Sequence, residues 1–167
     1  MYDLLGEREA QWQDISRLLE LTAHWQGEDG LWRQAEARLL EVSYVQVTKN
    51  YAAALDLVAP LVGMIQGAGF PTLEARIYNE WGEGLLRSGE HEKAFSKITQ
   101  ALALAREAQE LRLEALLLNS VGNVLTASLN YREAQAYIEE ALFLRRQLGD
   151  RHDISISLLN LGVYMAS

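Results

Sequence analysis

The sequence predicts an all-α protein built from repeated helix pairs, and three observations carry this prediction. Apolar residues recur at three- and four-residue spacing, whereas the alternation typical of strands is absent. The composition, 49% hydrophobic and 23% charged with two prolines in 167 residues, indicates a folded, helix-rich chain. The third observation is a self-similarity at an offset of forty residues, typical of solenoids whose units bury their apolar faces against each other. It relates Gly82, Gly122 and Gly162; Ala54, Ala94 and Ala134; and Ala101 and Ala141.

Turn signals divide the N-terminal half into three expected helices. The first covers approximately residues 4–25 and ends at a glycine-containing turn, 26–30. The second covers about 31–47 and ends at Lys49-Asn50. The third, about 51–66, contains Pro60, which is expected to interrupt and kink it because proline removes one helical hydrogen bond.

The C-terminal half contains five further expected helices, separated by turns at 67–71, Ser88-Gly89, Leu129-Asn130 and Gly149-Asp150. Gly82 and Gly122 lie inside two of these helices, where a glycine costs about 1 kcal/mol relative to alanine. A repeated glycine at such a position predicts close packing of two helices, with Ala94 and Ala134 on the facing helices. The expected ranges are about 72–87, 91–108, 111–127, 131–147 and 152–166.

The spacing of these small residues resembles the tetratricopeptide repeat (TPR). In that motif a small residue on the first helix is followed about twelve positions later by an alanine on the second, and by another small residue seven positions further on. Two sets fit this pattern: Gly82, Ala94 and Ala101, and Gly122, Ala134 and Ala141. The repeat length is similar to the forty-residue TPRs of the kinesin light chain and of polarity scaffolds. The stretch 148–151, followed by 158–162, is also typical of the C-terminal sensor arrays of bacterial signal-transduction ATPases and regulators.

This resemblance implies a right-handed superhelix of about seven to eight antiparallel helices. Residues 1–167 are expected to form a single TPR-like domain that is a fragment of a longer protein, with partial units at both ends. The resemblance is close over 71–167 and loose over 31–70, where Val42 stands at the small position. Arg38 and Glu41 stand where apolar residues belong, and a shift by one residue would bring Leu40 and Tyr44 into those places. The alignment of that unit therefore stays open. The complete units are expected at about 31–70, 71–110 and 111–150.

In the TPR family, the first helices of the pairs line a concave groove that holds a peptide. Carried over to this sequence, the resemblance implies a groove in which asparagine amides both donate and accept hydrogen bonds. Two alternatives stay open: asparagine is also an ordinary exposed helix residue that duplication copies, and the glutamates could simply pair with arginines one turn away. The implied partner-binding residues are Arg76, Asn79, Glu83, Asn119, Asn123 and, one position off the row, Asn160.

Charge and composition argue against several other functions. With 15 basic and 23 acidic residues the formal net charge is −8, which opposes binding to nucleic acids or anionic membranes. Cysteine is absent, and the three histidines lie far apart in sequence, so we expect no metal, no cofactor and no enzymatic activity. The chain has neither a membrane-length apolar stretch nor a signal peptide, and a cytoplasmic location is therefore expected.

The sequence thus predicts a protein-interaction module that holds a peptide or a protein partner. The alternative is a structural spacer that self-associates through exposed terminal helices, and binding of a small-molecule inducer is a third hypothesis. Trp12, Trp25 and Trp32 are expected to form an aromatic core between helices, with an exposed docking patch as the alternative.

Overall fold

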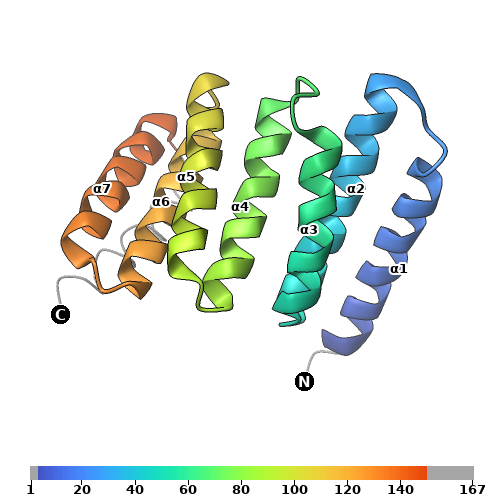
Figure 1. Cartoon of the computed structure of the whole chain (residues 1–167), viewed down its shortest axis with the longest axis horizontal. Coiled ribbons are helices and arrows are strands. Elements are labelled where there is room, and N and C mark those ends of the chain that lie inside the picture. The colour runs from blue at the N-terminus through green and yellow to red at the C-terminus, as the bar shows by residue number, and fades with distance from the viewer. Residues whose placement is uncertain (1–3, 150–167) are drawn as a thin grey trace. The chain divides into compact units, whose positions relative to one another are not determined.

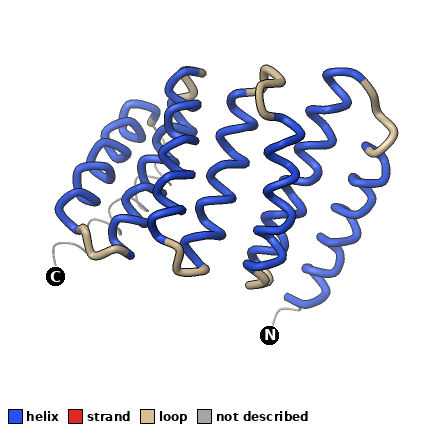
Figure 2. The backbone as a smooth tube through the Cα atoms, in the orientation of Figure 1, coloured by secondary structure: helices blue, strands red, loops and turns tan. Residues whose placement is uncertain are grey.

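The fold was analysed in a computed structural model that describes residues 4–149. Every regular element in this range is an α-helix, and seven helices follow one another along the chain (Figures 1 and 2). The prediction of an all-α helical fold is confirmed. The expected helix at 152–166, with Asn160 and Gly162, lies outside the described residues. The helices are α1 (Leu4–Thr22), α2 (Gly27–Val47), α3 (Tyr51–Ile65), α4 (Pro71–Arg87), α5 (His91–Glu107), α6 (Leu111–Ala127) and α7 (Tyr131–Leu148).

The chain divides into two compact units, with the boundary between Phe70 and Pro71. The same boundary separates the part of the sequence that resembles the TPR closely from the part that does so loosely. In the first unit, α2 packs against both α1 and α3. Its core contains Val42, Val58 and Leu61, which are each 1% exposed.

Two sequence predictions about the first unit are wrong. The turn expected through residue 30 ends earlier, because α2 already begins at Gly27. Gly30 is buried in that first helical turn, where a Cβ atom would lie 2.7 Å from the carbonyl carbon of Trp25. This glycine therefore permits a close approach of the α1–α2 connection. Pro60 does not interrupt α3, which continues to Ile65, and the proline lies on the exposed side of that helix.

The tryptophans of the first unit do not form the expected aromatic core. Trp12, Trp25 and Trp32 are 37%, 46% and 39% exposed. Trp12 contacts the ring of Tyr44 at a centroid distance of 5.2 Å, and the guanidinium of Arg33 lies over Trp25 at 5.0 Å. These contacts cover only part of each indole, so the alternative of an exposed aromatic surface describes the structure better.

In the second unit, α4 pairs with α5 and α6 pairs with α7, and α5 and α4 also contact α6. Gly82 and Gly122 lie where the paired helices approach each other. A Cβ atom at Gly82 would lie 2.9 Å from Cδ1 of Ile98, and one at Gly122 would lie 2.8 Å from Cδ1 of Ile138. The nearest backbone atoms are the carbonyl oxygens of the alanines on the facing helices, at 3.3 and 3.4 Å. The small residues Ala94, Ala101, Ala134 and Ala141 are all fully buried.

The backbone repeats the forty-residue period in both units. Each first helix ends with a left-handed residue, and the residue after it donates its N–H to the carbonyl five positions earlier, as Asn50 does to Val45 at 3.2 Å. The equivalent bonds join Glu90 to Leu85 at 2.9 Å and Asn130 to Leu125 at 2.8 Å. These helix ends are forty residues apart, so residues 31–70 align on the later units without a shift. In that alignment Val42, which is buried, is equivalent to Gly82 and Gly122. The left-handed residues are Lys49, Gly89 and Leu129 in one row, and Gly69, Gln109 and Gly149 in the other.

Candidate functional site

The structure brings together the predicted groove residues of α4 and α6. Asn79 and Glu83 are one turn apart on α4, and Asn119 and Asn123 occupy the equivalent positions on α6. The two helices are in contact, and the hydroxyl of Ser120 donates a hydrogen bond to the carboxylate of Glu83. Arg76 continues the α4 row by one turn. We call these five predicted residues together with Ser120 the α4–α6 polar face.

Much of this face is shielded from solvent. Asn119 is only 8% exposed, and Asn79, Glu83 and Asn123 are half-buried. Asn119 and Arg76 both have polar or electrostatic partners. Asn79 differs, because its side-chain oxygen is enclosed and finds no hydrogen-bond donor among the described residues. A buried acceptor without a donor costs about 1–3 kcal/mol, so its presence in a folded protein requires an explanation.

Glu83 is the electrostatically unusual group of the face. Burial raises the pKa of the Glu83 carboxyl, and the charge of Arg87 and the hydrogen bond from Ser120 offset only part of this effect. The surroundings therefore disfavour the charged form of Glu83. Carboxyl groups with a perturbed pKa next to a specific partner are found at functional sites, although ion-pair networks also produce them.

Sequence reasoning missed Ser120, whose hydrogen bond to Glu83 links α6 to α4. A serine inside a helix has many ordinary roles, and nothing in its spacing distinguishes it. Sequence reasoning did anticipate that Arg87 would act on Glu83, since the two are one turn apart. Arg76 and Glu80 likewise both engage partners.

The chemistry available on this face is hydrogen bonding by amides, with a carboxylate and a guanidinium alongside. An asparagine side chain can accept from a peptide N–H and donate to a peptide carbonyl, so a row of asparagines fits an extended backbone. Within residues 4–149, no three His, Cys, Asp or Glu side chains are grouped so that they could hold a metal ion. Among the described helices, none combines the length and the apolar character that crossing a membrane requires.

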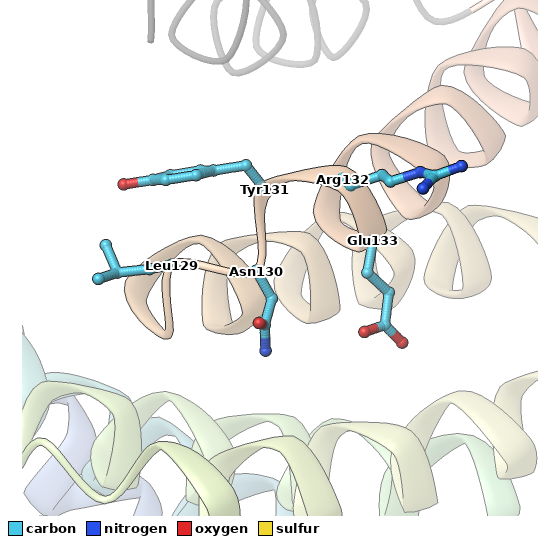
Figure 3. Close-up of a pocket in the computed structure, with 5 residues that line it drawn as sticks. All are labelled: Leu129, Asn130, Tyr131, Arg132 and Glu133. Atoms are coloured by element: carbon cyan, nitrogen blue, oxygen red, sulfur yellow. The ribbon is translucent and has the colours of Figure 1, made fainter.

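A separate recess of about 600 Å³ lies at the turn between α6 and α7, and none of the predicted groove residues lines it (Figure 3). The side chains of Asn130 and Glu133 point to the same side of the turn, whereas Arg132 points away from them (Figure 3). The recess is lined by Leu129, Asn130, Tyr131, Arg132 and Glu133.

No protein-family model matches the chain, and no curated protein sequence does. Among solved structures, the chain is similar to the apo form of RapI, with a TM-score of 0.81 and 14% identity over 96% of this chain and 44% of RapI. It is also similar to BtubC (BKLC) from P. vanneervenii, with a TM-score of 0.77 and 18% identity over 98% of this chain and 66% of BtubC. The chain thus spans less than half the length of RapI and about two thirds of that of BtubC. Both are helical TPR-like repeat proteins, so the chain has a TPR-like helical repeat fold.

Proposed function

We propose that this chain is a non-enzymatic protein-interaction module that holds an extended peptide segment on the α4–α6 polar face. The observation that carries the proposal is the enclosed oxygen of Asn79, which has no donor in the described structure. A peptide N–H would supply that donor after a rotation of the Asn79 amide. The TPR-like fold supports the proposal, because stacked helix pairs of this kind create extended surfaces for partners.

The energetics of the face point the same way. An unsatisfied amide oxygen and a carboxyl group whose charged form is disfavoured both reduce the stability of the free protein. Hydrophobic residues of similar size would fill these positions without that cost. A ligand that donates a hydrogen bond to the Asn79 oxygen would offset this cost. The resemblance of the sequence to sensor arrays leads us to propose a role in cytoplasmic signalling.

The test is peptide selection from a random display library against the immobilised chain, followed by affinity measurements on the double variant Asn79→Ala/Asn123→Ala. We expect binding of the enriched peptides to weaken by about tenfold or more, because each lost hydrogen bond contributes about 0.5–1.5 kcal/mol. Both residues are half-buried, so the fold should persist, which circular dichroism would verify. Asn119 is left unchanged because it is buried.

The matched control is Gln147→Ala, which removes an exposed amide on α7, away from the α4–α6 polar face. Its peptide affinity should equal that of the unaltered chain. Peptides that bind the double variant as tightly as the unaltered chain would show that this face is not the binding surface.

A second candidate function, assembly through the first unit, is favoured by an apolar stripe on α1. Leu18 and Leu21 are 42% and 57% exposed, and Trp25, three residues beyond the end of the helix, is 46% exposed. Introducing a charge by Leu21→Glu should shift a self-associating chain toward monomer in sedimentation velocity. A sedimentation coefficient that is independent of concentration in the unaltered chain would contradict this role.

A further inference from the structure

A second hollow in the C-terminal unit, of about 590 Å³, opens beside the recess of Figure 3 and is distinct from the α4–α6 polar face. Its accessible apolar surface comes mainly from Phe95 on α5, because Leu125 and Val124 of α6, which also line the hollow, are 5% and 0% exposed. Its polar side chains come from the first turn of α5, His91 and Glu92, and from the start of α7, Asn130 and Glu133. Its volume lies within the range of ligand-binding hollows, and most of its lining residues are polar.

Glu92 and Glu133 lie in the first turns of α5 and α7, where a carboxylate also complements the positive end of the helix. Within the described part of the chain, neither Glu92 nor Glu133 takes part in an ion pair or a side-chain hydrogen bond. Asn130 precedes the first residue of α7 but makes no side-chain capping bond. Figure 3 shows the side chains of Asn130 and Glu133 directed to the same side of the turn. These polar groups are therefore available to a ligand.

Charge decides which kind of ligand the hollow fits. Two helices, α5 and α7, begin here, and each N-terminus acts as roughly half a positive charge. Glu92 and Glu133 contribute two full negative charges, so the balance is about one net negative charge. The basic residue nearest in sequence to Glu92, Lys93, is engaged by Glu90 in an ion pair, and Arg132 points away from Glu133 (Figure 3). An anion would meet two carboxylates, whereas a cation is attracted.

We propose that this hollow binds a basic side chain, lysine or arginine, presented by a protein partner. The aliphatic stem of the side chain lies against Phe95 and the exposed edge of Leu125, and its charge lies between Glu92 and Glu133. Long basic side chains combine an apolar stem with a charged end, which matches the lining and the rim of the hollow. The chain as a whole carries a formal charge of −8, so a basic partner is also attracted at long range.

The test uses small probes with the full chain of 167 residues and reads the backbone amides by nuclear magnetic resonance. The basic probes are the Nα-acetyl amides of arginine and lysine, and the comparison probes are those of norleucine and glutamate. We expect the basic probes to cause saturable shifts at residues 91–95 and 128–133, with at least about fivefold weaker effects from norleucine. Equal shifts from norleucine or glutamate, or shifts spread over the whole chain, would overturn the proposal.

The variant Glu92→Gln/Glu133→Gln removes both charges and keeps the size of the side chains. Affinity for the basic probes should fall by about tenfold, as expected for the loss of two partly exposed charge contacts. Glu107→Gln is the matched control, since it removes an exposed carboxylate elsewhere on α5 and should leave the affinity unchanged. Unchanged affinity in the double variant, with the fold intact by circular dichroism, would also refute the proposal. The α4–α6 face is unaltered in these variants, so peptide binding there is scored independently.

Discussion

At the scale of single residues, Glu83 predicts a measurable dependence of stability on pH. Its pKa is raised in the folded chain, so the folded state holds the proton more tightly than the unfolded state does. The contribution of the protonated carboxyl to stability is therefore complete below the ordinary glutamate pKa of about 4.3 and is lost as the pH rises through the raised value. Glu83→Gln imitates the protonated form and still accepts a hydrogen bond from Ser120.

We expect Glu83→Gln to melt at a higher temperature than the unaltered chain at pH 7 and at the same temperature near pH 4. Thermal unfolding followed by circular dichroism across this range measures the difference. Glu107→Gln, at an exposed position, should show no such convergence. A lower melting temperature of Glu83→Gln at pH 7 would mean that the attraction of Arg87 outweighs burial, contrary to the direction of the pKa.

Gly82 predicts a steric coupling between α4 and α5. Gly82→Ala gains about 1 kcal/mol in helix propensity but places Cβ against Ile98 and 3.3 Å from the carbonyl oxygen of Ala94. Because overpacking of this kind costs about 1–3 kcal/mol, we expect a net loss of about 1 kcal/mol in the free energy of unfolding. Urea denaturation measures it.

A double-mutant cycle separates the clash from other effects. In an Ile98→Ala background, which removes the clashing carbon atoms, Gly82→Ala should become neutral or stabilising. Gly63→Ala is the control, because no atom lies within 4 Å of a Cβ there and the helix should gain about 0.5–1 kcal/mol. Additive effects of the two substitutions would exclude direct contact as the cause.

The residues of the candidate site could be predicted only in part. Asn79 and Asn119 are one period apart, and the alignment alone assigns them to neighbouring helices. The bond from Ser120 to Glu83 and the lone oxygen of Asn79 depend on side-chain directions and on local burial, which spacing does not determine. The hollow beside the α6–α7 turn was missed for the same reason, since its residues come from three helices.

At the scale of helices and turns, the sequence predicted every described helix, and the exceptions have local causes. The glycines at 27 and 30 were both taken as turn residues, although only Gly27 has a left-handed backbone. Pro60 is predicted to interrupt and kink the third helix, but α3 continues to Ile65 and the proline lies on its exposed side. The left-handed residues at the helix ends favour the alignment of residues 31–70 on the later units without a shift. Side-chain types alone left that alignment open.

The helix ends also give a prediction about stability. Gly89 and Leu129 occupy equivalent turns with φ of 82° and 64°, but only glycine adopts this conformation without strain. Leu129→Gly relieves about 1–2 kcal/mol of strain and loses about 0.4–1 kcal/mol through the freer unfolded chain. Since Leu129 is 70% exposed, little packing is lost, and the net gain in the free energy of unfolding should be about 0.5–1 kcal/mol.

Two neighbouring substitutions test this explanation by urea denaturation. Gly89→Ala should destabilise the chain by about 1 kcal/mol because it introduces the same strain. Ala127→Gly, inside the last turn of α6, should destabilise it as well, because glycine has no conformational advantage there. If Leu129→Gly proves as destabilising as Ala127→Gly, the left-handed turn is not the source of the effect.

At the scale of the whole molecule, a repeat protein is stabilised by its intrinsic repeat energies and by contacts between neighbours. The forty-residue period predicted this architecture, and the looser resemblance to the repeat before residue 71 coincides with the division at Phe70 and Pro71. The first unit exposes Leu21, Trp25 and Val47 by 57%, 46% and 61%, whereas α6 of the second unit buries nine of its residues.

This contrast predicts that the two units open at different free energies. Among the described side chains of α1, only Ile15 and Thr22 are buried, and the helix packs against α2. Few buried contacts mean a low cost of local opening, so amide hydrogens of α1 should exchange at least about 100-fold faster than those of α6. Hydrogen–deuterium exchange with peptide-level detection measures both. Equal protection of α1 and α6 would mean that the chain opens as one cooperative block. The variant Ile15→Ala, which removes a buried side chain of α1, distinguishes the two cases. Exchange should become faster in α1 alone if the units open separately, and in every helix if the chain opens as one block.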